Sequence, residues 1–427
     1  MRTDKEPTGN SKYIFGLNKV RAITIIRNSD GISRAEIAKM SGLSAPTVSR
    51  IVEALITDGM VTEIGEGKSN GGRRPTLLAF SGSSNYVIGI DLGTTKTHGI
   101  LSDLDAKIIA EAQCPTPVES GFESVMEQTA AVISDLKAHL GGDDKQILGI
   151  GMAVAGLINR HRKVVEFSPD FHWHDVDVVR ELKRHHNLPI IFDNVSRVMA
   201  LGELSYGIGR TYDHFILVNV GYGIGAGIII DGAPLFGPLG MAGEFGHITL
   251  EKNSQIRCDC GNFGCLEALA SGNAIAKTAR AALRSGISSD LSDMCEGNFR
   301  RITARHVATA ASSGDALSRR ILGEAFEYLG IGIAGLINLF TPEAIVIAGG
   351  VAEAGDVLFD SVREAVRSRG LNKAAGKVIL KPATFGHRAA AMGAASLILQ
   401  DVLSLEHADH ITMMPKKAFA EALSDSP

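Results

Sequence analysis

The sequence predicts an α/β protein in which a small helical module precedes a larger body of alternating strands and helices. Residues 15–56 repeat apolar side chains at helical spacing, whereas strand and helix patterns alternate from residue 86 onward. The distribution of charge divides the chain in the same way. Residues 1–80 contain 12 Lys or Arg and 8 Asp or Glu, whereas the whole chain has a net charge of -4. A basic module is therefore attached to an acidic body.

The composition is that of a folded globular chain. With 427 residues, 45% hydrophobic and 21% charged, the chain is long enough for two or three domains and is not disordered. It begins with no signal-peptide pattern, and the apolar stretch near residues 329–340 is short and glycine-rich for a membrane span. We therefore expect a cytoplasmic protein without a membrane partner.

Three helices are expected in the N-terminal module. The apolar pattern of the first ends at the turn sequence Asn-Ser-Asp-Gly, residues 28–31. Ser33 and Glu36 have capping-box spacing and begin a short second helix, which stops at Gly42. Ser44 caps a third helix with small polar residues and an arginine on one face. Two helices joined by such a glycine turn are typical of a helix-turn-helix.

A wing follows the third helix. Strand patterns at residues 61–64 and 76–80 flank a glycine-rich loop that ends in Gly-Gly-Arg-Arg-Pro and can reach phosphates or the minor groove. The alternative is a plain three-helix core with a solvated loop, but the capped helix together with the wing favours DNA binding. The expected DNA contacts are Ser44, Thr47, Ser49, Arg50, Arg73 and Arg74.

The body begins with a strand, a Leu-Gly-Thr-Thr-Lys turn and a returning strand, residues 86–101, whose backbone amides can surround a phosphate. A second glycine-rich loop covers residues 219–227. The other elements are expected as helices at 125–140, 329–339 and 389–403 and strands at 147–154 and 342–347.

The densest cluster of chemically distinctive residues lies in residues 243–269. Cys258, Cys260 and Cys265 fall within eight residues, and His247 precedes the first of them by eleven. One imidazole and three thiolates make a sufficient tetrahedral shell for a structural zinc ion. Three reduced cysteines in a loop are the alternative, and a disulfide is disfavoured because nothing marks the chain as secreted.

These residues carry a family resemblance. Ala-Gly-Glu-Phe-Gly-His at 242–247, followed by Cys-x-Cys-Gly-x-x-Gly-Cys-x-Glu at 258–267, resembles the signature of the ROK family of repressors and sugar kinases, and the similarity extends from about residue 17 to 403. It implies a winged helix-turn-helix followed by a two-lobed actin- and hexokinase-like ATPase fold. It also implies zinc on the histidine and cysteines, and sugar contacts from Glu244, His247 and Glu267.

Two further sugar contacts are expected from the resemblance. Asp170 stands where ROK proteins carry the asparagine of Pro-Asn-Leu, and its alternative role is a turn or helix cap. Asn194 keeps the first asparagine of the kinase motif Asn-Asp-Ala-Asn.

The kinase motif itself is altered. Alignment on Gly202 and the following glutamate places Val195 at the catalytic aspartate, and valine cannot accept the proton of a sugar hydroxyl. On a strand, Asp193 would lie about 6.5 Å from that position, too far to replace it. Tyr222 stands where kinases carry a threonine in the second phosphate loop and would crowd a phosphate. We therefore expect no enzyme activity.

The sequence thus predicts a repressor of sugar uptake or catabolism genes that senses a sugar or sugar derivative. An active sugar kinase with an appended DNA-binding domain is the alternative, which Asp91, Gly93 and Thr95 favour, and regulation by a protein partner is another. The expected partners are operator DNA and a sugar effector, and the expected assembly is a homodimer or homotetramer. The predicted segments are a DNA-binding domain (1–80), a linker (81–85), a kinase-like body (86–403) with its zinc loop (247–265), and a tail (404–427).

Overall fold

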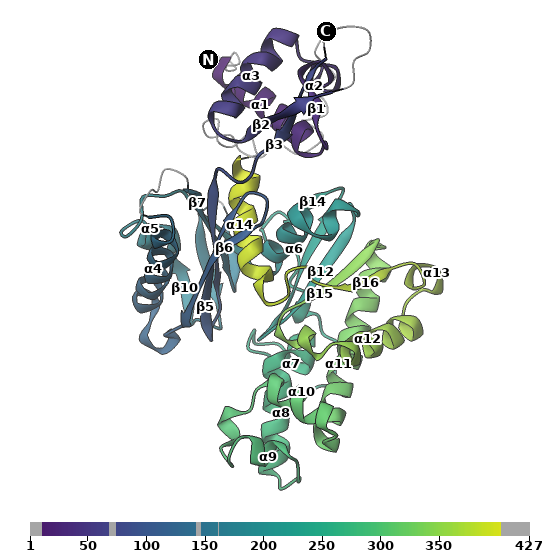
Figure 1. The fold of residues 1–427 in the computed structure, drawn as a ribbon. Coiled ribbons are helices and arrows are strands. Elements are labelled where there is room, and N and C mark those ends of the chain that lie inside the picture. Colours follow the sequence, from purple (N-terminus) through teal and green to yellow (C-terminus); the bar gives the residue numbers. More distant parts are fainter. Residues whose placement is uncertain (1–10, 68–73, 142–146, 161, 403–427) are drawn as a thin grey trace, which may run out of the picture.

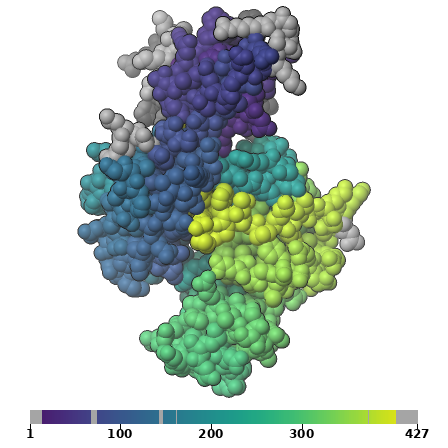
Figure 2. Space-filling model, in the orientation of Figure 1, coloured from purple at the N-terminus to yellow at the C-terminus, as the bar shows by residue number. Residues whose placement is uncertain are grey.

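The computed structural model describes residues 11–67, 74–141, 147–160 and 162–402. A small N-terminal unit stands at one end of a two-lobed body, and a group of helices lies at the other end (Figure 1). The space-filling view shows the same N-terminal unit, in purple, projecting from the body (Figure 2).

The N-terminal unit is a winged helix-turn-helix, as predicted. Its helices are α1 (Ser11–Arg27), α2 (Arg34–Ser41) and α3 (Ala45–Thr57), and its sheet has the order β1 (Ile32–Ser33), β3 (Thr76–Phe80), β2 (Val61–Glu66). The Ser33 capping box is present, and Gly42 ends α2 with φ 70°. The helices bury one apolar core that includes Ile26, Ile37, Ile51 and Leu78.

The predicted linker, residues 81–85, forms hydrogen bonds with both the N-terminal unit and the body. The backbone N–H of Ser81 donates to the carbonyl of Met60 in the N-terminal unit at 2.9 Å. The N–H of Gly82 donates to the Asp105 carboxylate in the body at 3.1 Å. The segment therefore holds the two parts in a defined orientation.

Each lobe of the body is built on a five-stranded mixed sheet. The first has the order β11-β7-β4-β5-β6, and the second has the order β14-β13-β12-β15-β16. In each, an antiparallel hairpin continues into parallel strands. The first-sheet strands are β4 (Tyr86–Leu92), β5 (Lys96–Asp103), β6 (Ile108–Pro115), β7 (Ile147–Val154) and β11 (Ile190–Asn194). The second-sheet strands are β12 (Phe215–Val220), β13 (Ile224–Ile230), β14 (Ala233–Pro234), β15 (Ala344–Ala348) and β16 (Ile379–Pro382). A small sheet of β8 (Leu157–Asn159), β9 (Val164–Ser168) and β10 (Trp173–Val176) extends the first lobe.

Two helices, α6 (Val195–Tyr206) and α14 (Ala389–Val402), lie side by side between the large sheets (Figure 1). The helix α14 packs against the first sheet at Gly151, where an added Cβ would stand 1.8 Å from the carbonyl oxygen of Ala394. A Cβ on Gly202 of α6 would stand 2.8 Å from the Cα of Gly393 in α14. Because backbone meets backbone at these points, α6 and α14 form a tightly packed layer.

The other helices cover the sheets or form a group at the end of the body away from the N-terminal unit (Figure 1). They are α4 (Phe122–Ala138), α5 (Val178–Leu182), α7 (Leu266–Ala270), α8 (Gly272–Arg284), α9 (Leu291–Met294), α10 (Ala304–Ser313), α11 (Ala316–Phe340), α12 (Asp356–Arg369) and α13 (Asn372–Ala375). The outer helical group at that end of the body contains α8, α9 and α10. Short 3-10 turns join them, among which η4 (Phe245–His247) is important for the site.

One element is longer than expected. The predicted helix at residues 329–339 is the second half of α11, which has 25 residues because Asp315 caps it much earlier in the chain. By length and composition α11 is the one described helix that passes as a membrane span, but 61% of its apolar window is buried in the body. It is therefore a core helix of the second lobe.

Candidate functional site

The predicted metal ligands come together. The ligand atoms of His247, Cys258, Cys260 and Cys265 all lie within 4.8 Å of one another. The Cys260 and Cys265 sulfurs are 3.8 Å apart, and the Cys258 sulfur is 3.7 Å from Nδ1 of the histidine. A tetrahedral ion with bonds of about 2.3 Å to sulfur requires sulfurs about 3.8 Å apart. The donor set and its spacing therefore fit a four-coordinate metal ion.

The loop that holds these ligands turns at two glycines. Gly261 has φ 99° and Gly264 has φ 67°, in the region that other residues adopt only with strain. Burial raises the pKa of the Cys258 and Cys265 thiols above its ordinary value. A bound ion would replace those thiol protons, so metal uptake should release protons.

His247 connects the metal cluster to two acidic residues. Its Nδ1 faces the cysteines, whereas its Nε2 lies 3.8 Å from a carboxylate oxygen of Glu244. Burial raises the pKa of Glu244, and the charges of His247 and Arg197 oppose that shift. A metal ion on Nδ1 would fix the ring, which leaves Nε2 oriented toward the carboxylate.

The Glu267 carboxylate contacts both β13 and the metal cluster. One of its carboxylate oxygens accepts a 2.8 Å hydrogen bond from the N–H of Ile224 in β13, and the other lies 3.9 Å from the sulfur of Cys258. The carboxylate thus links the second phosphate loop to the metal cluster.

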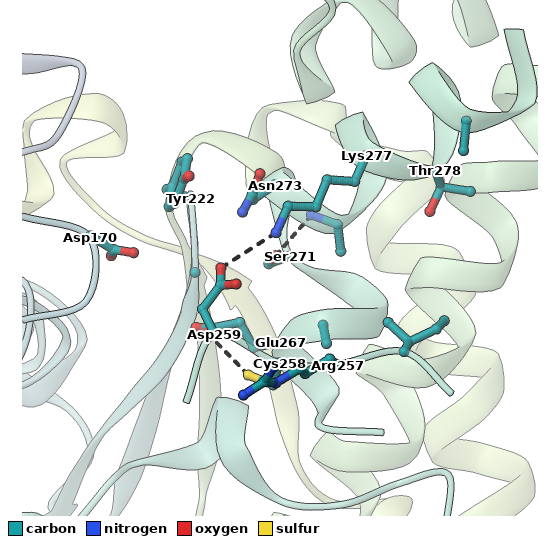
Figure 3. Close-up of a pocket in the computed structure, with 15 residues that line it drawn as sticks. Asp170, Tyr222, Arg257, Cys258, Asp259, Glu267, Ser271, Asn273, Lys277 and Thr278 are labelled. Carbon is teal, nitrogen blue, oxygen red and sulfur yellow. Dashed lines mark hydrogen bonds and ion pairs between the residues drawn. The ribbon is translucent and has the colours of Figure 1, made fainter. Parts of the chain in front are cut away.

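A cavity of about 240 Å³ opens beside Glu267 (Figure 3). Asp170 contributes to it from the loop between β9 and β10 of the first lobe, and Tyr222 from the turn between β12 and β13 of the second. Burial, together with the nearby carboxylates of Glu267 and Asp259, raises the pKa of Asp170 to about 6. The cavity therefore lies where the lobes face each other, and it disfavours additional negative charge.

Asn194 has a structural task. It is the N-cap of α6: its side-chain oxygen accepts a 3.0 Å hydrogen bond from the N–H of Ser196, and its amide nitrogen donates to the carbonyl of Gly156 at 3.0 Å. One amide hydrogen is left over, because the group has two. A sugar contact through that hydrogen stays a prediction.

The residue predicted to stand at the position of the kinase base has an apolar side chain. Val195 is the first residue of α6 and not a strand residue, so the strand spacing expected between it and Asp193 is wrong. Asp193 instead forms two hydrogen bonds with Arg197, at 2.6 and 2.9 Å, and both side chains are 4% exposed. Its charge is neutralised in the core, which removes the nearest alternative carboxylate.

The two loops predicted to resemble phosphate loops follow β4 and β12. Burial raises the pKa of Asp91 in the first loop to about 6, and Lys96 partly opposes that shift. In the second loop, the Tyr222 ring is 50% exposed at the turn. Gly349, which directly follows β15, is required sterically, since an added Cβ would stand 2.4 Å from the carbonyl oxygen of Val220.

The predicted DNA contacts lie on α3 and at the end of the wing. Ser44 is the exposed N-cap of α3, and its hydroxyl lies 2.8 Å from that of Thr47. Arg50 is exposed and stacks 4.4 Å over the Phe15 ring. Arg74 pairs with Glu66 across the base of the wing at 4.0 Å. Ser49 lies on α3 and is half-buried, whereas Arg73 lies outside the described residues.

Sequence reasoning missed the face of α8. Asn273, Lys277 and Thr278 line the cavity, and their helix α8 follows the predicted zinc loop after the short helix α7. Asn273 and Lys277 are four residues apart and therefore lie on one face of α8, which was the available signal.

Comparison with known proteins assigns the chain to a family. Residues 87–401 match the ROK family, and residues 18–62 match the winged helix-turn-helix DNA-binding family. The chain belongs to the ROK family.

Two relatives and one solved structure illustrate the range of this ROK chain's similarities. The xylose repressor of Caldicellulosiruptor bescii is 32% identical over 93% of the chain and 98% of the repressor. The glucokinase of Thermotoga maritima is 34% identical over 74% of the chain and 98% of the kinase. A crystal structure of a ROK family transcriptional regulator, homologous to the Escherichia coli MLC protein, aligns with a TM-score of 0.77 at 26% identity, covering 92% and 97% of the two chains.

Proposed function

We propose that this ROK protein is a DNA-binding repressor of sugar uptake or catabolism genes, and that its kinase-like body binds a sugar or sugar derivative without phosphorylating it. The main support for this proposal is that a chain with a winged helix-turn-helix lacks a carboxylate at the position expected for the catalytic base. Val195 stands at the base position, and Asp193 is neutralised by Arg197. Full-length similarity to a xylose repressor supports the same conclusion.

The metal cluster is proposed to hold a structural zinc ion. All four positions of a tetrahedral ion would be filled by His247 and the three cysteines, so the ion would have no open position for catalysis. The ion supplies a fixed orientation for the imidazole. His247, Glu244 and Glu267 then bind sugar hydroxyls, with Asp170 approaching from the other lobe.

A route from the sugar site to the DNA-binding domain is available along α6. The helix starts at its cap Asn194, beside the altered catalytic position, and ends at Tyr206, which contacts Arg27 of α1. A ligand that prefers one arrangement of the lobes would therefore move the base of the DNA-binding domain.

The repressor is proposed to act as a homodimer or homotetramer. A single winged helix offers few base contacts, whereas a symmetric pair reads a palindromic site. The segments 1–80, 81–85 and 86–403 are the proposed functional units, followed by a tail.

The competing proposal is an active sugar kinase, which the retained Asp91 and the similarity to a glucokinase favour. The test is sugar-dependent release of ADP from ATP, with xylose, glucose and their amino derivatives as acceptors. Our proposal expects none above background. Turnover that Asp91→Ala abolishes would establish the kinase instead.

The effector is found by measuring the thermal stability of the zinc-loaded protein against a sugar panel that begins with xylose. A ligand at a hundred times its dissociation constant stabilises a protein by about 2.7 kcal/mol, which is readily detected. If no sugar has an effect, the sensor proposal fails and control by a protein partner takes its place.

A further inference from the structure

We infer that the cavity beside Glu267 is a second saccharide subsite with Tyr222 as its platform, so that the effector is larger than one sugar ring. The inference rests on the proposed sugar-sensing function and concerns the size of the ligand. A disaccharide or a short glycoside is the class that it fits.

The cavity extends beyond the residues that are predicted to bind the first sugar ring. Of the five predicted sugar residues, all within the described part of the chain, only Asp170 and Glu267 line it. Its other walls are the turn at Tyr222, the zinc-loop residues 256–259 and one face of α8 that extends to Ala281. The cavity thus starts at the predicted monosaccharide position and continues along α8, away from the other three predicted sugar residues.

The walls have the chemistry of a carbohydrate site. Tyr222 offers a half-exposed aromatic ring, and sugar rings pack their C–H faces against such surfaces. Polar side chains surround it, as a saccharide with many hydroxyls requires. They are Asp170, Asp259, Ser271, Asn273, Lys277 and Thr278.

The charges of the cavity select against an anionic ligand. Three carboxylates line it against two cations. One of the cations, Lys277, already pairs with Asp259 at 3.4 Å, as Figure 3 shows. A phosphorylated sugar or a nucleotide would meet excess negative charge, whereas a neutral saccharide would not.

The turn that carries Tyr222 is held in place by α8, which forms another wall of the cavity. The N–H of Asn273 donates to the carbonyl of Tyr222 at 3.2 Å, and the N–H of Gly272 donates to the carbonyl of Gly221 at 2.9 Å. The turn is thereby bonded to the first turn of α8. A ring on a fixed turn binds a second sugar unit with little loss of conformational entropy.

The test is isothermal titration calorimetry of the zinc-loaded protein with matched pairs, xylose against xylobiose and glucose against cellobiose. For the sugar that binds, we expect the disaccharide to bind about tenfold more tightly than its monosaccharide. Tyr222→Ala should remove that advantage and change the monosaccharide affinity by less than about twofold, whereas Tyr222→Phe should retain it.

A second variant tests the cavity independently of the platform. Thr278 is exposed on α8, so Thr278→Trp should fold and should block the outer compartment, which lowers only the disaccharide affinity. Equal affinity for both members of each pair, or an equal loss of both in Tyr222→Ala, would overturn the subsite while leaving the sensor proposal intact. Binding of neither member of either pair, together with no stabilisation by any sugar of the panel, would overturn both proposals.

Discussion

The guanidinium of Arg27, in the last turn of α1, donates a 3.1 Å hydrogen bond to the carbonyl oxygen of Ser205 in the last turn of α6. The same group lies 5.9 Å from the ring centroid of Phe80 and 5.7 Å from that of Tyr206. Burial lowers the pKa of Arg27. One cation therefore joins the DNA-binding domain, the end of its wing strand and the helix that starts at the proposed sugar site.

Arg27→Ala should uncouple the sugar from the DNA. A charged hydrogen bond and a cation–π contact together contribute about 1 to 3 kcal/mol, so their loss should loosen the domain interface. The variant should bind sugar as wild type does, but the sugar should change its operator affinity several-fold less. Calorimetry and DNA titration measure the two quantities. Arg34→Ala, which removes an exposed ion pair within the DNA-binding domain, is the control and should respond normally.

Cys260→Ser should lose the metal and lower the melting temperature, because ligand atoms that hold an ion contribute its binding free energy to folding. Metal content by mass spectrometry and thermal unfolding check this. Cys114→Ser, outside the cluster, should keep one zinc ion per chain. Unchanged zinc content in Cys260→Ser would remove this cysteine from the site.

Arg74→Ala should weaken operator binding and make it less dependent on salt. Each lost phosphate contact reduces the slope of log K against log salt by about 0.9. Arg73, outside the described residues, carries the same expectation. Arg301→Ala removes a cation of the outer helical group and is the matched control. An unchanged affinity and slope in Arg74→Ala would exclude the wing residue from the interface.

Asp91 should make stability fall as pH rises. Its folded pKa of about 6 lies above the unfolded value near 4, so the folded state holds the extra proton between these values. Ionisation of the buried Asp91 lowers the free energy of unfolding. This loss is absent below about pH 4 and reaches its full size above about pH 6. Asp91→Asn should therefore raise the melting temperature relative to wild type more at pH 8 than at pH 5. An equal difference at both values would contradict the raised pKa.

Much of this molecule follows from local sequence signals. Ser33 with Glu36 and Ser44 predicted helix starts that the structure confirms, because caps act within one turn. The spacing of the cysteines predicted their convergence with His247. These features depend on residues close together in the chain.

Sequence reasoning missed one local signal and several features that depend on tertiary packing. Val195 was placed on a strand, although the Asn194 cap that starts a helix there acts within one turn. The pairing of Asp193 with Arg197 joins residues four apart across the boundary between β11 and α6, so it depends on where that boundary lies. The contact of Arg27 with Ser205 joins elements whose approach no local pattern specifies. The cavity along α8 likewise combines residues of the predicted zinc loop, the Tyr222 turn and the other lobe.

The central claim is that sugar binding in the body changes DNA binding by the winged helix, and one titration tests it directly. Operator duplexes selected from random DNA are titrated with wild type and with Glu244→Ala, with and without the sugar that stabilises the wild type. Glu324→Ala, an exposed carboxylate on α11, serves as the control. We predict that the sugar changes the operator affinity of wild type and of Glu324→Ala at least fivefold, whereas Glu244→Ala binds the operator equally well and does not respond. A sugar that binds the wild type and leaves its operator affinity unchanged would contradict the proposal.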